Sequence, residues 1–168
     1  MELGAPWRPV PDRWSLDRHT LRVQVPATID FVRASTRRHG SGLWATMVCT
    51  HRVDHRHIFA GLAAQTLDFD VLDLIADRLV QRIVGWNRWE AEHVWTNTLG
   101  AWPTIDGDMR LSGVDLLALG PAAATNTAFA WWRKNLGENA DEWKKWTRDM
   151  ERVPRRAIIA AAEEPMSG

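Results

Sequence analysis

The sequence predicts a mainly α-helical, compact multi-helix domain, and three observations lead to this fold class. From about residue 58 onward, apolar residues recur at steps of three and four, which is the spacing of one face of a helix. Pro, Asn and Gly stand at the ends of these stretches, where helices prefer them. Apolar residues make up 45% of the 168 residues and charged residues 25%, a composition typical of a folded globular protein.

The first third of the chain predicts a short N-terminal β-hairpin or an extended arm. The first twenty residues contain three Pro and two Trp without a period, so they favour an extended arm. Apolar and polar residues alternate over residues 20–25, which is typical of a half-buried strand. Pro26 ends that strand and opens a short helix over residues 27–35. Residues 43–53 are rich in β-branched side chains and predict a second strand.

A well-capped helix is predicted over residues 70–84. Asp70 has the side chain of an N-cap, and Gly85 suits the left-handed position after the last turn. Between them, four apolar residues at helical steps form one stripe that we expect in the core: Leu72, Ile75, Leu79 and Ile83.

Two more helices are predicted by the residues that cap them. Asn87 and Glu90 have the spacing of a capping box at the start of a helix that runs through Leu99. Four residues share one face of that helix: Ala91, Val94, Trp95 and Thr98. Pro121 suits the first position of a helix that runs to Leu136. Its buried face is marked by four residues: Ala122, Phe129, Trp132 and Leu136.

Shorter elements are predicted in the same way. Pro103 opens a short helix, which the Asp-Gly-Asp turn at residues 106–108 and a later Ser-Gly pair delimit. Asn139 and Glu142 are spaced like a second capping box at the start of a helix that Pro154 ends. We expect the tail after Pro154 to be frayed or to become ordered on a partner.

These elements divide the chain into three parts. Residues 1–66 form an N-terminal arm and a small α/β subdomain, residues 67–153 a helical core domain, and residues 154–168 a flexible C-terminal tail. Residues 1–66 hold nine Arg against five acids, and residues 67–118 hold four Arg against nine acids. These basic and acidic parts either attract each other, within one chain or between copies in a homo-oligomer, or they are two ordinary solvated surfaces.

Charge and hydropathy exclude several classes of protein. Lys plus Arg and Asp plus Glu both total 21, so no net field favours nucleic acid or a membrane surface as a partner. We expect no signal peptide, because no basic leader precedes an apolar core, and no membrane-spanning run of about 18 apolar residues. Cys49 lies in an apolar run and predicts a buried, inert thiol. We therefore expect a cytoplasmic protein.

The strongest candidates for a metal site are His51, His55 and His57. On a helix, His51 and His55 would share one face, and on a strand all three would. However, no Glu follows His51 as in an HExxH motif, and Arg52 and Arg56 would repel a cation. We therefore interpret the three as structural or surface histidines, predict no metal, and keep a metal site as the alternative.

The sequence predicts no catalytic residue and no cofactor. Asp106, Asp108 and Asp115 lack the spacing and the closing Glu of a calcium loop. The glycines form no nucleotide-binding motif, GxSxG is absent, and Cys49 with nearby histidines is too weak a pair to predict a nucleophile. These observations favour a protein that works by binding other proteins.

Eleven Trp and no Tyr are the feature that points to a binding surface. Each indole buries a large apolar area and carries one N–H that needs a partner, and Trp is enriched at protein interfaces. Helical spacing places Trp95 and Trp132 on core faces. Four other tryptophans are our candidates for partner binding: Trp89, Trp131, Trp143 and Trp146.

Three stretches of the chain resemble one known family. They are GWNRWEAEHVW at residues 85–95, WPTIDGDMRLSGVDLL at 102–117 and ATNTAFAWW at 124–132, within roughly residues 68–135. They resemble proteins encoded by tailed phages of actinobacteria and described as tail assembly chaperones. The resemblance implies a non-catalytic protein of the host cytoplasm that binds the tape-measure protein and keeps it soluble. Such a protein helps the major tail protein to polymerise and is absent from the finished particle.

Two other classes of function stay open from the sequence. One is a structural virion protein, such as a head–tail connector or a minor tail component, which would remain in purified particles. The other is a small metal-dependent enzyme built on the three histidines, which metal analysis of the purified protein would identify. The first 66 residues resemble no known family, so the resemblance implies no role for them.

Overall fold

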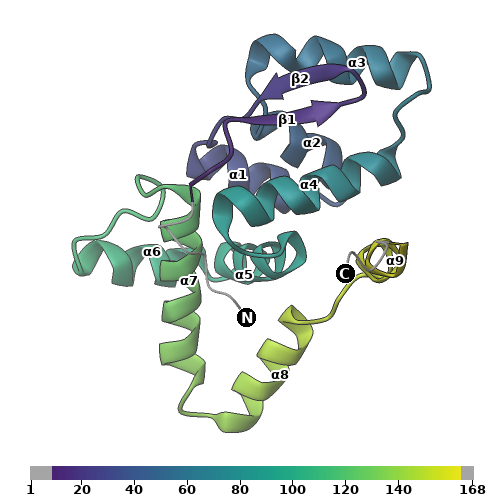
Figure 1. Cartoon of the computed structure of the whole chain (residues 1–168). Coiled ribbons are helices and arrows are strands. Elements are labelled where there is room, and N and C mark those ends of the chain that lie inside the picture. The colour runs from purple at the N-terminus through teal and green to yellow at the C-terminus, as the bar shows by residue number, and fades with distance from the viewer. Residues whose placement is uncertain (1–8, 164–168) are drawn as a thin grey trace.

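The computed structural model describes residues 9–163, and within that range the chain forms nine α-helices, one short 3₁₀ helix and one two-stranded hairpin (Figure 1). The predicted fold class, a mainly α-helical compact domain, is confirmed. None of the helices in this range is long and apolar enough to cross a lipid bilayer. Figure 1 shows the hairpin and α1–α4 in the upper part of the molecule, with α5–α8 below them.

The hairpin consists of β1, Arg13–Leu16, and β2, His19–Arg22, which pair antiparallel. The predicted strand over residues 20–25 overlaps β2, whose ladder partner is the segment before it, and from residues 43–53 Thr50 pairs with Val23 in an isolated antiparallel bridge. The hairpin also replaces part of the predicted extended arm. Its turn is tight enough to hold Asp17 at a φ of 49°, and Asp tolerates this left-handed conformation better than most residues.

The prediction of a strand over residues 43–53 is wrong, because most of this segment is helical. It contains α2, Ser41–Val48, then the 3₁₀ turn η1, Arg52–Asp54, and the start of α3, His55–Ala63. The physical reason is tertiary packing: α2 lies against α4 and buries Ala45 and Thr46 there, which outweighs a weak β propensity. Where α2 contacts α4, the Thr46 hydroxyl donates a hydrogen bond to the Leu72 carbonyl of α4 at 3.4 Å. The predicted helix before it is confirmed as α1, Thr28–Ser35.

Two central helices follow the predicted positions closely. In α4, Phe69–Val84, the N-cap is Asp68 and not Asp70, and its carboxylate accepts a hydrogen bond from the Val71 amide at 2.8 Å. Gly85 has a φ of 79° after the last turn, as predicted. In α5, Arg88–Gly100, the predicted capping box is present. The predicted stripe of α4 is buried at three positions and half-buried at Ile75.

Four further helices complete the described chain: α6, Trp102–Leu111; α7, Pro121–Leu136; α8, Ala140–Met150; and α9, Arg155–Glu163. Residues 106–108 lie inside α6, so the predicted Asp-Gly-Asp turn is wrong, and the helix ends at the Ser-Gly pair, where Gly113 has a φ of 74°. The tail differs from the predicted frayed segment, because residues 155–163 form α9. Residues 164–168 lie outside the described range.

The core consists of two neighbouring clusters of apolar side chains. The larger one joins side chains from α1, α2, α4, α5, α7 and α8, and includes the fully buried Trp95 and Cys49. The smaller one lies between the hairpin, α2, α3 and the start of α4. Both clusters take residues from each side of the predicted boundary near residue 66. Whether the parts fold independently at that boundary stays a prediction.

Candidate functional site

A continuous set of aromatic rings lies where α5, α7 and α8 meet, and we call it the aromatic cluster. Its members are Trp86, His93, Phe129, Trp131, Trp132, Trp143 and Trp146. Trp86 stands just before α5, and the other members come from α5, α7 and α8, where Phe129 with Trp132 and Trp143 with Trp146 are each three residues apart on one helix face. The set therefore extends from buried to half-buried positions along α7 and α8.

Trp146 is the centre of the aromatic cluster. Its ring stacks on Trp143 at 5.4 Å and on Trp132 at 6.0 Å, and the His93 ring meets it edge-on at 4.8 Å. Such offset and edge-to-face pairs are favourable beyond the apolar area that they bury. Only 8% of Trp146 is exposed, so it fixes α8 against α5 and α7.

The indole N–H groups at the outer end of the cluster have partners in other helices. Trp132 donates to the Thr98 hydroxyl of α5 at 3.1 Å, and Trp131 donates to the Asp108 carboxylate of α6 at 3.0 Å. The two neighbouring rings meet at right angles, with centroids 5.1 Å apart. These bonds hold both indoles in fixed orientations, although each ring is only half-buried.

The structure separates the predicted binding tryptophans. Trp131 and Trp143 are half-buried members of the aromatic cluster, and Trp146 is a buried one. Trp89 is also half-buried, but it makes no ring contact with the cluster within the described residues, and its indole nitrogen is buried without a hydrogen-bond partner there. That these four residues bind a partner stays a prediction.

The two predicted core tryptophans differ in burial. Trp95 is fully buried, as predicted, and its indole donates to the Thr125 hydroxyl at 2.9 Å. Trp132 is only half-buried, packed against the edge of the larger core cluster. The buried face of α7 is rotated from the predicted one, because Ala124, Ala128 and Phe129 point into the core. Helical spacing predicts which residues share a face, but the neighbouring helices decide how wide the buried face is.

Burial also changes the protonation of groups beside the aromatic cluster. Desolvation lowers the pKa of His93, and its Nε2 atom is buried without a hydrogen-bond partner within the described residues. Desolvation raises the pKa of Glu90 and Glu92 on the same helix, although the Asn87 amide donates to Glu90 and opposes the shift. The ring of His93 is therefore neutral at pH 7, as contact with an apolar indole favours.

A network around a buried arginine joins four helices, and the sequence did not predict it. Arg88 of α5 is 1% exposed and pairs with Asp73 and Asp77 of α4 at 2.6 Å each. Its third partner is the Ser41 hydroxyl of α2 at 2.9 Å, and Arg156 of α9 pairs with Asp77 at 3.1 Å. The only sequence signal is the spacing of the two aspartates, one helical turn apart, which places them on one face.

Two of the three candidate histidines, His55 and His57, have other contacts in the structure. The Nε2 atom of His55 lies 2.9 Å and 2.8 Å from the carbonyl oxygens of Met47 and Thr50, so it must donate a proton there. The His57 ring packs on His19 with centroids 4.2 Å apart. Residues 9–163 contain no group of three or more His, Cys, Asp or Glu placed to hold a metal ion. The structure thus does not bring the three histidines together.

Asp54, which lies within the same sequence segment, is part of an ion pair. The Arg22 guanidinium and the Arg22 amide both donate to its carboxylate, at 2.9–3.0 Å, and hold its pKa well below the usual range. This pair fastens the end of β2 to the start of α3. Asp54 therefore has a structural role in the segment that carries the histidines, as the partner of Arg22.

Comparison of the chain with protein-family models, with curated proteins and with solved structures gives no match. A functional proposal therefore rests on the residues and their geometry.

Proposed function

We propose that this protein is a phage tail assembly chaperone, which binds the tape-measure protein and assists assembly of the tail tube without catalytic chemistry. The observation that carries the proposal is the aromatic cluster, whose Trp131, Trp132 and Trp143 rings are left half-buried along α7 and α8. Two of the stretches that resemble the chaperone family, residues 85–95 and 124–132, supply α5 and α7 to this cluster.

Half-buried tryptophans suit the binding of an apolar helix. An indole offers a flat, rigid surface that loses little conformational entropy on binding, and Trp is the residue most enriched in binding hot spots. A tape-measure protein has long apolar helical faces, which must be covered before tube subunits surround them. A surface of fixed indoles covers such a face through apolar contact. It also releases the face again, because the contact contains no covalent bond and no buried ion pair.

The proposal places the protein in the host cytoplasm, with the tape-measure protein and the major tail protein as partners. A chaperone of this kind leaves before the particle is complete. A connector or minor tail component, the competing structural function, stays in the particle. Mass spectrometry of purified particles distinguishes the two functions, because only the structural protein is found there in stoichiometric amounts.

The central experiment is co-expression with the tape-measure protein of the same phage, measuring how much of it remains soluble. We expect the double variant Trp89→Ala/Trp131→Ala to stay folded and to capture its client roughly tenfold more weakly, as loss of interface tryptophans does. The matched control is Phe59→Ala, which removes an aromatic ring that is 52% exposed on α3, outside the aromatic cluster. It should keep the client soluble.

Separate single variants identify which tryptophan acts. Trp131→Ala removes a member of the aromatic cluster, and Trp89→Ala removes a ring outside it. Circular dichroism checks the fold of each variant. Equal client solubility with the wild type, the double variant and the control would show that these residues are not the binding surface.

A further inference from the structure

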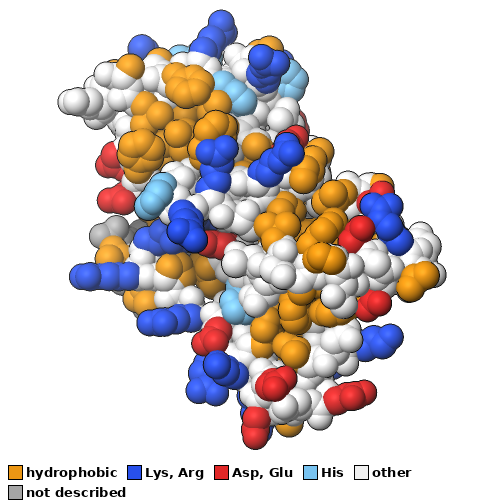
Figure 2. Space-filling model, turned by 180° about the vertical axis from the view of Figure 1, so that it is seen from behind, with side chains coloured by type: hydrophobic (Ala, Val, Ile, Leu, Met, Phe, Trp, Pro, Cys, Tyr) orange, Lys and Arg blue, Asp and Glu red, His pale blue; other side chains and the backbone are white. Residues whose placement is uncertain are grey.

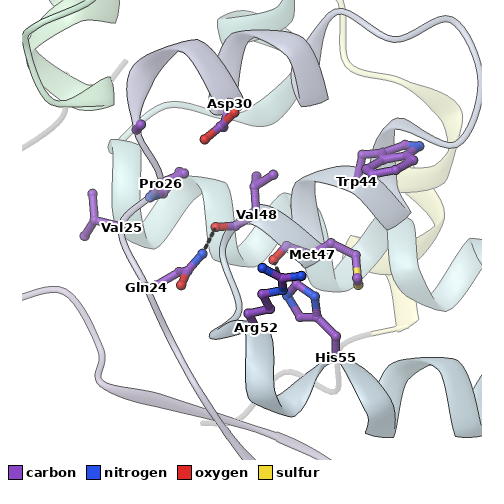
Figure 3. A pocket seen from close by; sticks show the side chains of 10 residues that line it. Gln24, Val25, Pro26, Asp30, Trp44, Met47, Val48, Arg52 and His55 are labelled. Atoms are coloured by element: carbon purple, nitrogen blue, oxygen red, sulfur yellow. Dashed lines mark hydrogen bonds between the residues drawn. The ribbon is translucent and has the colours of Figure 1, made fainter.

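α8 is fastened to the rest of the fold by the packing of apolar and aromatic side chains. Other elements have polar ties: Figure 3 shows the Gln24 side chain donating to the Val48 carbonyl at the end of α2, at 3.1 Å. Side-chain hydrogen bonds likewise link α5 with α7 and α6 with α7. Among the residues that the structure describes, no side-chain hydrogen bond or ion pair connects α8 with another helix. The position of α8 therefore depends on its apolar face.

That face and the opposite one differ sharply in character. Four residues at steps of three and four are buried or half-buried: Trp143, Trp146, Thr147 and Met150. The exposed charged residues of α8 are Asp141, Glu142, Lys144, Lys145, Arg148 and Asp149. Figure 2 shows charged side chains of both signs at the lower end of the back face, where α8 and the end of α7 lie (Figure 1). α8 is thus an amphipathic helix, with an outer face that suits water.

The apolar face of α8 covers three rings of α5 and α7. These rings, which contact Trp146 or Trp143 of α8, belong to His93, Phe129 and Trp132. We call these three residues the α5–α7 face. Its Trp132 ring adjoins the half-buried Trp131. If α8 moved away, the α5–α7 face would become a continuous aromatic surface next to Trp131.

The contact between α8 and the α5–α7 face leaves polar atoms unsatisfied. The Trp146 indole nitrogen and the His93 Nε2 atom are both buried, and neither has a hydrogen-bond partner within the described range. A buried polar atom without a partner weakens the contact that encloses it, because water would satisfy that atom once the contact opened. Between α5 and α7, by contrast, the Trp132 indole has the Thr98 hydroxyl as its partner. α8 is therefore the less completely bonded of the two neighbours of α5.

We propose that α8 is a displaceable cover of the α5–α7 face and lies where a helix of the client binds. This inference rests on the proposed chaperone function and adds the regulation of its binding surface. The client helix would carry large apolar residues at the same steps of three and four as α8, and would replace it on the three rings. Residues 137–139 keep α8 attached to α7, and the Arg156–Asp77 pair keeps α9 at α4. α8 thus competes with the client at a high effective concentration and holds the rings covered until the client arrives.

The first experiment offers the full-length protein a second copy of α8 as a free peptide. The probe is fluorescein-labelled ENADEWKKWTRDMER, the sequence of residues 138–152, and its binding is followed by fluorescence anisotropy. We expect the Trp146→Ala protein to bind this peptide at least about tenfold more tightly than the wild type, because its own α8 competes less well. If circular dichroism shows that Trp146→Ala is unfolded, Trp143→Ala takes its place, since that ring is only half-buried.

Two controls separate displacement from general loosening of the fold. Ile58→Ala removes a fully buried side chain from the smaller core cluster, away from α8, and should bind the peptide as the wild type does. The peptide ENADEAKKATRDMER, in which Ala replaces both tryptophans, should not bind Trp146→Ala. Equal binding of the two peptides, or equal affinity of Trp146→Ala and Ile58→Ala, would overturn the proposal.

Hydrogen exchange of the wild type supplies a test that needs no variant. We expect the amides of α8 to exchange through a local opening, at least about tenfold faster than those of α4. Added tape-measure protein should lower the protection of α8 and raise that of α5 and α7. Equal protection of α8 and α4 in the free protein would mean that α8 opens only when the whole protein unfolds, which contradicts a displaceable cover.

The outcomes distinguish this inference from the proposed function. A client that binds while α8 keeps its full protection overturns the inference and leaves the chaperone function in place. A peptide that binds Trp146→Ala, when the tape-measure protein binds neither that variant nor the wild type, supports the displaceable cover and contradicts the chaperone function.

Discussion

At the scale of single residues, His93 shows how burial next to an indole sets a charge state. Its ring contacts Trp146 on one side, and Asp149 is the charged group on α8 that acts on it. Burial outweighs that carboxylate, so the pKa of His93 in the folded protein lies below its ordinary value in the unfolded chain. The unfolded chain therefore binds a proton on this residue more readily than the folded protein does.

This difference predicts a pH dependence of stability. The contribution of neutral His93 is fully present above the unfolded pKa of about 6.5 and is lost as the pH falls through that value toward the lowered folded pKa. We expect the unfolding free energy of the wild type to fall more than that of His93→Phe between about pH 7 and pH 5. Urea unfolding at several pH values, followed by circular dichroism, measures this difference.

The comparison between variants is necessary because other groups titrate nearby. Glu90 and Glu92 have raised pKa values in the folded protein, so they act in the opposite direction and stabilise the fold as the pH falls. His39→Phe, at an exposed position, serves as the control and should keep the wild-type slope. Identical slopes for His93→Phe and the wild type would contradict the assigned burial effect.

At the scale of secondary-structure elements, two glycines show how contact between helices decides the effect of a side chain. A Cβ atom on Gly42 of α2 would lie 2.2 Å from the Asp73 carboxylate and 2.8 Å from its Cα atom. The backbones of α2 and α4 thus approach each other too closely for any side chain at this position. A Cβ atom on Gly107 of α6 meets nothing within 4 Å.

The two substitutions should therefore change stability in opposite directions. Gly42→Ala forces α2 away from α4 and should lower the free energy of unfolding by about 1–3 kcal/mol, as overpacking does. Gly107→Ala, inside a helix with open space around it, should raise it by about 0.5–1 kcal/mol, because Ala is the better helix former. Denaturant unfolding measures both variants, and a loss of stability in Gly107→Ala would show that α6 has a covered face.

At the scale of the whole molecule, the Arg88 network connects elements that are far apart in the sequence. The guanidinium joins α2, α4 and α5, and Asp77 extends the network to Arg156 of α9. A charge that is only 1% exposed is tolerated because every side of it faces a carboxylate or a hydroxyl. The Arg156–Asp77 pair is thus a contact between α9 and α4 that the sequence did not predict.

Removing this guanidinium should affect the whole fold. Arg88→Met leaves two aspartates without their main partner and should lower the free energy of unfolding by about 3–5 kcal/mol, as breaking a buried pair does. The control is Arg110→Met, which breaks an exposed pair with Asp106 and should cost much less because water and salt screen it. Equal losses in urea unfolding would mean that the Arg88 site is solvated.

Several features of this fold follow from local sequence alone. The capping box at Asn87, the left-handed Gly85 and the proline that starts α7 are confirmed, and so are the helices next to them. The burial of Cys49 and Trp95 was also predictable, and burial raises the pKa of the Cys49 thiol to about 12. These features depend on hydrogen bonds and apolar steps within a few turns, so the sequence nearby contains the necessary information.

The tertiary structure decided the rest. Residues 43–48 belong to α2 and not to a strand because α2 packs closely on α4 at Gly42, and a short apolar run does not by itself distinguish a strand from a helix. Trp146 is buried and Trp132 is half-buried because of the helices that cover them, which no spacing along one helix reveals. The Arg88 network brings together residues from four helices. Only the packed chain places such residues side by side, since their contacts are long-range and each depends on all the others.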